Sequence, residues 1–304
     1  MYRLIAFNRM ENLIFKSSGA VANQGEAMEA ETILKHGRIS KSRMSRNNFW
    51  GITCFALLLA TVTLMMGCGG GSGGGGSAKI KMTTEKDGYI DFNLAGSGVA
   101  TVDWGDDSEK VTLTLDENGV TFEHRYPNAT IRTITVYGDN IKRFCCWEMG
   151  LTSLDVSKNT ALTSLECYRR NKLTNLDVSK NTTLTKLSCG NNQLTSLDVS
   201  KNTALTYLSC GNNQLTSLDV SKNTALTYLS CGWNQLTNLD VSGAAPLVEL
   251  DCRGNQLSAT ALNALFGTLN SNPGGKVIYT GNNPGVRTCD RSIFERKGWR
   301  EGSH

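Results

Sequence analysis

The feature that most constrains this chain is a 21-residue unit that recurs through its C-terminal half. One copy reads LTSLDVSKNTALTYLSCGNNQ, and the copy after it differs at a single residue. A unit this short cannot bury its own leucines, so successive copies must stack and share one core. The full copies begin at Leu173, Leu194, Leu215 and Leu236, and a weaker copy of 22 residues begins at Leu151.

Each unit predicts two short extended segments joined by turns. In the strand around Leu208 and Cys210, alternation places these two side chains inside and Tyr207 and Ser209 outside. Stacked copies would then form parallel strands about 4.8 Å apart. The outward positions of this [LF]-x-C strand vary between copies, whereas the LDVSKNT half barely changes. Variation on one face of a regular scaffold favours a binding surface, so we expect this strand to line the concave side.

Three polar or sulfur-bearing columns recur with the repeat, and we predict a structural role for each. The Asn column should satisfy backbone groups inside the turns, the Cys column should be buried free thiols, and the Asp column should stabilise a recurring turn. The columns are Asn192, Asn213, Asn234 and Asn255; Cys146, Cys167, Cys189, Cys210, Cys231 and Cys252; and Asp155, Asp177, Asp198, Asp219 and Asp240.

The charge is unevenly distributed along the chain. The formal net charge is +4, but 8 of the 31 Lys and Arg and only 4 of the 27 Asp and Glu precede Cys68. The rest of the chain is neutral, which argues against nucleic-acid binding. The three His are scattered and no CxxC pair occurs, so we expect no metal site and no cofactor.

The N-terminal part predicts a membrane tether. Residues 1–43 are polar and unpatterned, and they are interpreted as a disordered or mis-assigned leader. Residues 44–68 hold a basic residue, an apolar run from Phe49 to Met66 and then Gly67 and Cys68, which is typical of a signal peptide. Its end is similar to a bacterial lipobox, in which case Cys68 is lipidated. A retained transmembrane anchor is the alternative. Residues 69–77, GGGSGGGGS, predict a flexible tether.

Residues 78–140 contain six or seven short runs of β-forming residues broken by Gly, Asn and Asp, which predicts a small β-sandwich. The order VDWGDD, HRY and TITV resembles PKD-like domains of the immunoglobulin class. Asp103, Asp106 and Asp107 are interpreted as acids that stabilise a turn, with calcium binding as the alternative.

Residues 141–256 are assigned to the repeats and 257–304 to a C-terminal cap. The segment IKRFCCWEMG already has repeat spacing, so the sandwich should join the first coil directly and cover its open end. In the cap, residues 259–270 predict a helix and 276–283 a last strand.

The LxxLxxNxL units resemble those of bacterial internalin-like leucine-rich repeats. The lipobox, the Gly/Ser tether, the WGD sandwich and the repeats together are similar to leucine-rich-repeat lipoproteins of Bacteroidetes. The fold expected is mostly β, a short leucine-rich-repeat solenoid of 21-residue repeats capped by a small N-terminal β-sandwich. The resemblance implies a cell-envelope location, with an outer-membrane lipoprotein favoured, and a protein or host-surface partner. It implies no reaction.

Candidate binding residues are departures from the repeat at outward positions, where exposed aromatic residues and Arg are typical of interface anchors. Cys145 and the inserted Arg169–Arg170 pair are also expected on this face. The candidates are Arg143, Trp147, Tyr168, Lys186, Tyr207, Tyr228, Trp233, Glu249, Asp251 and Arg253.

Two functions remain open from the sequence. The first is a membrane-tethered, non-enzymatic protein that binds a protein or host-surface partner through its concave face. The second is a structural or assembly subunit of an envelope complex without a dedicated external ligand. The sequence offers no nucleophile–base set and no phosphate-binding loop, so an enzyme is not expected.

Overall fold

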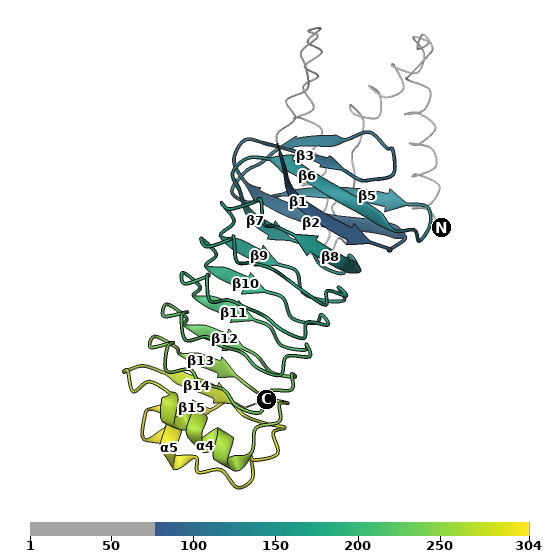
Figure 1. Cartoon of the computed structure of the whole chain (residues 1–304). Helices are drawn as coiled ribbons and strands as arrows, with labels where there is room; N and C mark the ends of the chain where they lie inside the picture. Colours follow the sequence, from purple (N-terminus) through teal and green to yellow (C-terminus); the bar gives the residue numbers. More distant parts are fainter. Residues whose placement is uncertain (1–76, 304) are drawn as a thin grey trace, which may run out of the picture. The chain divides into compact units, whose positions relative to one another are not determined.

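The computed structural model describes residues 77–303, and the elements of this part are almost all strands (Figure 1). The predicted leader, the signal segment with Cys68, and the tether up to residue 76 lie outside the described residues. The elements are β1 Ala78–Thr84, β2 Gly88–Gly96, β3 Val99–Asp103, β4 Val111–Thr114, β5 Val120–Tyr126, β6 Arg132–Gly138, β7 Ile141–Cys145, β8 Leu151–Asp155, β9 Ser164–Glu166, β10 Lys186–Ser188, β11 Tyr207–Ser209, β12 Tyr228–Ser230, β13 Glu249–Asp251, α4 Ala259–Thr268, β14 Lys276–Tyr279, α5 Ser292–Glu295 and β15 Trp299–Glu301.

The strands form two sheets. One has five strands in the order β4-β3-β6-β1-β8, and the other has ten in the order β15-β14-β13-β12-β11-β10-β9-β7-β2-β5. Successive side chains of a strand point to opposite faces of the sheet. In β2, Ile90, Phe92 and Leu94 are buried and therefore mark the inner face, while Asp91 is exposed on the other face. In the N-terminal part, aromatic rings fill the space between the sheets, with Phe92 in contact with Trp104 at a ring-centroid distance of 5.6 Å.

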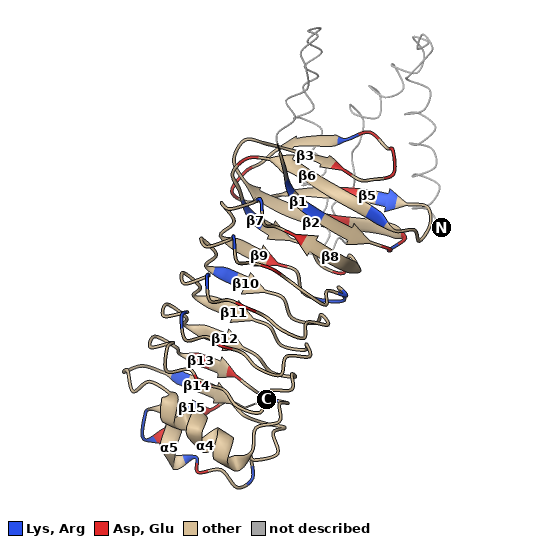
Figure 2. Ribbon diagram, in the orientation of Figure 1, with Lys and Arg blue, Asp and Glu red and all other residues tan. Residues whose placement is uncertain are grey.

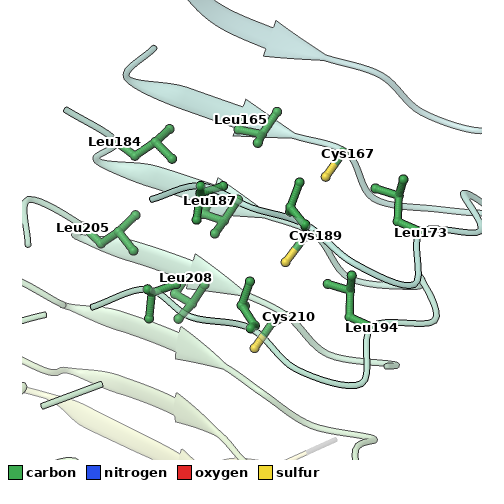
Figure 3. Close-up of a cluster of buried hydrophobic side chains, with 14 of the residues drawn as sticks. Leu165, Cys167, Leu173, Leu184, Leu187, Cys189, Leu194, Leu205, Leu208 and Cys210 are labelled. Atoms are coloured by element: carbon green, nitrogen blue, oxygen red, sulfur yellow. The ribbon is translucent and has the colours of Figure 1, made fainter. Parts of the chain in front are cut away.

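The solenoid strands pair in parallel with a one-to-one register, so equivalent residues of successive coils are neighbours. Leu187 pairs with Leu208, and Leu208 pairs with Leu229. The leucines and cysteines of successive coils point inward as stacked columns (Figure 3), and Cys189 and Cys210 are fully buried. The expected mostly β fold with a stacked repeat solenoid is confirmed.

The sandwich and the first coil are joined through both sheets. In the ten-stranded sheet, Phe144 of β7 pairs antiparallel with Leu94 of β2 and parallel with Leu165 of β9. In the five-stranded sheet, Leu154 of β8 pairs with Met82 of β1. A single hydrophobic core therefore runs from the sandwich through the coils, which covers the open end of the solenoid as expected.

The second half of each coil differs from the expected extended segment. Only its first copy forms a strand, β8, and that strand is paired with β1 rather than with the next coil. In later copies the chain turns instead. The Asn202 amide donates to the Val199 carbonyl at 3.0 Å, and the Ser200 amide donates to Asp198 Oδ1 at 2.8 Å.

The C-terminal part continues the parallel ladder beyond Cys252. The predicted helix is present as α4, with the Ser258 hydroxyl accepting from the Ala261 amide, and the predicted strand is present as β14. A further strand, β15, pairs with β14 and was not predicted. Within residues 77–303, no helix has the length and apolar character that a bilayer span requires.

Candidate binding face

The outward side of the ten-stranded sheet carries the predicted site residues. We call this side the strand face; it comprises the outward side chains of β2, β5, β7 and β9–β14 and of the turn residues that follow the solenoid strands. The pairing register places equivalent outward residues in rows across the sheet. One row is Ala95, Arg143, Ser164, Lys186, Tyr207, Tyr228, Glu249 and Val277, and the next is Thr121, Asn93, Cys145, Glu166, Ser188, Ser209, Ser230, Asp251 and Tyr279.

The middle of the first row is a connected group of side chains. The Tyr207 and Tyr228 rings stack with centroids 4.3 Å apart and planes at 3°. Lys186 Nζ lies 5.5 Å from the Tyr207 ring centroid and forms an ion pair with Glu166 Oε1 at 2.9 Å. Glu249 follows Tyr228 in register. Four of the predicted residues are therefore neighbours along one row.

Two smaller groups lie toward the ends of the solenoid. At the sandwich end, the Trp147 and Tyr168 rings are tilted at 45° with centroids 6.0 Å apart. At the other end, Arg253 Nη2 pairs with Asp251 Oδ2 at 2.7 Å, and the Arg253 guanidinium lies 5.0 Å from the Tyr279 ring centroid. The structure thus distributes the predicted residues over one face in groups, rather than gathering them in one cleft.

Trp147 and Trp233 occupy positions that the scaffold gives to smaller residues. Trp147 directly follows the column cysteine, where the middle coils have Gly190, Gly211 and Gly232. Trp233 has a φ of +57°, at a turn position where the other coils include Asn191 and Asn212 at +54°. Their exposed fractions are 47% and 51%, respectively. Both indoles are therefore half exposed on the strand face.

A pocket of about 370 Å³ lies where the sandwich meets the first coils. We call it the junction pocket. Its lining includes Arg143, Cys145 and Trp147, which the sequence places on this face, and sandwich residues that the repeat pattern does not predict. Alternation in YIDFNLAG does place Asp91 and Asn93 outward, but their proximity to Trp147 depends on the β2–β7 pairing. The lining residues are Asp91, Phe92, Asn93, Asn118, Thr121, Arg143, Cys145, Trp147 and Glu166.

Cys145 lies at an outward position of β7, as expected. It lines the junction pocket, but only 7% of it is exposed. Burial, with a smaller contribution from the charge of Glu166, raises the pKa of Cys145 to about 11. Burial beside Tyr207 likewise raises the pKa of Tyr228 to about 12. Neither group therefore titrates near neutral pH.

The structural roles predicted for the repeated polar columns are confirmed. Asn213 Nδ2 donates to the carbonyls of Cys189 and Cys210 at 3.1 and 3.0 Å, and its Oδ1 accepts from the Leu194 amide at 3.0 Å. The six column cysteines are buried and free. A second buried column of asparagines, not predicted from the sequence, lies in the LDVSKNT half of the coils, where Asn202 Nδ2 donates to the carbonyls of Val178 and Asn181.

Two of the three acids considered for calcium, Asp103 and Asp106, already have protein partners. Asp103 Oδ2 pairs with Lys110 at 3.0 Å, and Asp106 Oδ2 with His124 Nε2 at 2.7 Å. The pKa of Asp103 is lowered chiefly by the hydrogen bond from Lys110. These contacts favour the turn interpretation. Over residues 77–303, no three His, Cys, Asp or Glu side chains gather in a way that could hold a metal ion.

Comparison with known families identifies the repeats. Residues 182–223 match the model described as Leucine Rich repeats (2 copies). No curated protein matches the chain in sequence. The PKD-like resemblance of the sandwich stays a prediction.

Among solved structures, the chain is similar to internalins of Listeria monocytogenes. The functional domain of InlJ, described as including a cysteine ladder, is 30% identical over 49% of this chain and 38% of that one, with a TM-score of 0.41. The internalin inlF is 21% identical over 49% of each chain, with a TM-score of 0.41. The chain thus spans less than half the length of either protein.

Proposed function

We propose that this protein is a non-enzymatic binding protein that engages a protein partner through the strand face, on the concave side of the solenoid. The observation that carries the proposal is the pair of half-exposed tryptophans at positions where the scaffold accepts Gly or Asn. At the positive φ of Trp233 a large side chain costs backbone stability, so its presence there favours a role outside the fold. Stacked Tyr207 and Tyr228 between them add rigid aromatic area of the kind interfaces use.

We further propose that the chain is held at a bacterial cell envelope, in an outer membrane, by the segment that ends at Cys68. The apolar run before Cys68 and the Gly/Ser run after it support this location. Charged residues of both signs are interspersed along the described elements (Figure 2), which favours a protein surface over a polyanion as the partner.

Site-specific photocrosslinking in intact cells tests the binding face. A benzophenone amino acid at Trp233 or Tyr207 should give a partner adduct. The same amino acid at Thr195 or Thr216, exposed positions in the LDVSKNT half of the coil, is the matched control and should give none.

Equal adducts from both sets would contradict a dedicated strand face and favour the alternative of an assembly subunit packed on several sides. Radiolabelled palmitate incorporation, compared with a Cys68→Ser variant, tests the lipid anchor separately. Incorporation that persists without Cys68 would contradict that anchor.

A further inference from the structure

The ten-stranded sheet has a free edge at each of its two ends. Within residues 77–303, β15 pairs with β14 alone at one end of the strand order, and β5 pairs with β2 alone at the other. Each edge strand therefore has one row of backbone amides and carbonyls without a neighbouring strand. An edge of this kind can accept a strand from another chain.

The two edge strands run in the same direction. The solenoid strands from β9 to β15 are parallel with one another and with β7. Strand β2 is antiparallel to β7, and β5 is antiparallel to β2, so β5 runs parallel with β15. A second copy that is shifted along the sheet without being turned over therefore presents β5 to β15 as a parallel neighbour. This is the pairing that already joins the coils.

The sandwich end of the sheet is acidic. From β3 to β5, residues 99–126 contain seven Asp and Glu but only two Lys and Arg, and the loop that follows β3 is mostly acidic (Figure 2). Two of these acids are paired, one with Lys110 and one with His124. Even with Arg125 counted, this end carries a formal net charge of −5. The acids that are exposed and form no ion pair in the part of the chain that the structure describes are Asp107, Glu109, Asp116, Glu117 and Glu123.

The C-terminal end of the sheet is basic. Residues 285–303, which include α5 and β15, contain five Lys and Arg and three Asp and Glu, a formal net charge of +2. Arg300 belongs to the edge strand itself, where it is exposed and pairs in register with Val277. Arg287, Arg291 and Arg296 are also exposed, and over residues 77–303 none of these four arginines is in an ion pair. The two free edges therefore carry opposite charge.

We propose that copies of this protein associate head to tail, with β15 of one copy beside β5 of the next. Opposite charges attract the two unlike ends, whereas two like ends repel each other. The contact joins two different surfaces, so it is heterologous and each added copy leaves a new free edge. This inference goes beyond the proposed function, because the partner is a second copy of this chain and the contact uses the ends of the sheet rather than Tyr207 and Trp233.

Sedimentation velocity of the full chain in detergent micelles tests the association. At low salt, the sedimentation coefficient should rise with protein concentration and pass the value of a dimer, because the contact does not close. At about 0.5 M salt, self-association should be at least about tenfold weaker, since screening then limits charge attraction to several ångströms.

Charge reversal at each end tests which surfaces meet. The C-terminal variant is Arg287→Glu, Arg291→Glu and Arg300→Glu, and the sandwich variant is Glu109→Lys, Glu117→Lys and Glu123→Lys. Either variant alone has two ends of like charge, so it should self-associate at least about tenfold more weakly than the unaltered chain. An equimolar mixture of the two variants should recover the association, because each reversed end again meets an end of opposite charge.

The matched control reverses three exposed charges away from both ends. Lys180→Glu, Lys201→Glu and Lys222→Glu, in the LDVSKNT half of three coils, make the same charge change as the C-terminal variant. This control should associate like the unaltered chain. A weakening equal to that of the C-terminal variant would show that net charge, rather than the sheet ends, governs the association, and would overturn the inference.

Three further results would also overturn the inference. They are a chain that stays monomeric at low salt up to roughly 0.1 mM, association that stops at dimers, and a mixture of the two variants that does not recover association. The salt series on the unaltered chain needs no variant, so association that does not weaken with salt decides against the inference even where a variant fails to fold. Photocrosslinking at Trp233 and Tyr207 tests the strand face separately.

Discussion

Trp233 sits in a backbone conformation that its side chain disfavours. Its φ of +57° places it in the left-handed region, where equivalent coils include Asn and Gly. Its ring lies on the next coil, since a Cβ added to Gly254 would come within 2.6 Å of the indole. The positive φ therefore destabilises the folded chain at Trp233, whereas packing of the indole on Gly254 stabilises it. The net effect on the free energy of unfolding can be measured.

We predict that Trp233→Asn raises the free energy of unfolding by about 1 kcal/mol, because Asn tolerates the left-handed region in which most residues lose roughly 1–2 kcal/mol. Urea unfolding followed by circular dichroism measures the change. The reciprocal variant Asn212→Trp should lower stability by a similar amount. If Trp233→Asn is strongly destabilising instead, the indole belongs to the scaffold and the argument for a binding anchor fails.

Removal of one ladder asparagine should have a much larger effect. Asn213→Ala leaves two carbonyls and one amide without their buried partner, and each such loss costs about 1–3 kcal/mol. We therefore expect the free energy of unfolding to fall by at least about 3 kcal/mol in the same urea assay. The exposed neighbour Gln214→Ala is the control and should change it by less than about 0.5 kcal/mol. Similar values for the two variants would contradict the ladder's role.

The positions of the repeated residues in the fold were predictable from the sequence. Contacts between residues of distant segments were not. Leu208, Cys210 and Asn213 were placed correctly because strand alternation and one repeat period fix their environment. The ten candidate residues fall on one face for the same reason. The junction pocket was missed because Asn93 and Cys145 meet only through a pairing between strands about 50 residues apart, for which the sequence carries no local signal.

At the scale of the element, an aspartate stabilises the turn that follows the LDV segment of each coil by accepting a backbone hydrogen bond. We call this aspartate the cap. Asp177, Asp198 and Asp219 each accept from the amide of the serine two residues later at 2.8 Å. These backbone hydrogen bonds are the main reason that the pKa of each carboxyl lies below its ordinary value of 3.8. The same geometry repeats in every middle coil, so the effects of the caps on stability should add.

We predict that these caps make the solenoid sensitive to acid. A carboxyl with a lowered pKa in the folded chain contributes stability that is present above pH 3.8 and is lost as the pH falls through the folded value. The Tm should therefore decline from pH 5 to pH 2. A variant with Asn at all three positions keeps an acceptor oxygen without the titration, and its Tm should decline less. An unchanged pH profile in that variant would contradict the assignment.

The last elements show where element-level prediction stops. Helix α4 was predicted from its Leu262, Leu265 and Phe266 spacing, and all three are buried. Strand β15 was missed because Trp299–Glu301 carries no part of the repeat pattern. Its place is set by β14 and by contacts such as that of Trp299 Nε1 with the Asn270 carbonyl at 2.9 Å.

At the scale of the whole described part, the sandwich and the solenoid share one core. Phe144 illustrates this, since it is fully buried, packs edge-on against Phe92 at 5.7 Å and pairs with Leu165 of the next coil. The boundary between the two parts of the fold is therefore a packed interface rather than a linker, and the two should stabilise each other.

We predict that Phe144→Ala destabilises both parts together, by about 3–5 kcal/mol. Hydrogen exchange by mass spectrometry in increasing urea should show peptides of β5 and of β11 losing protection in one transition. Leu250→Ala, at the far end of the solenoid, is a comparison that should lower the same transition. Loss of protection in β5 alone would show that the sandwich unfolds as an independent unit.

Because the solenoid strands of the ten-stranded sheet pair residue for residue, equivalent positions on the strand face lie one strand spacing apart. The copies beginning at Leu194 and Leu215 differ only in that Asn212 of the first corresponds to Trp233 of the second, so duplication or deletion of the Leu194 copy leaves every new coil contact complementary. Such a change moves Trp147 and Trp233 relative to each other by one strand spacing, about 4.8 Å, without altering either residue's surroundings. The distance between Trp147 and Trp233 can therefore change by whole strand spacings through recombination between repeats, with no substitution at either residue.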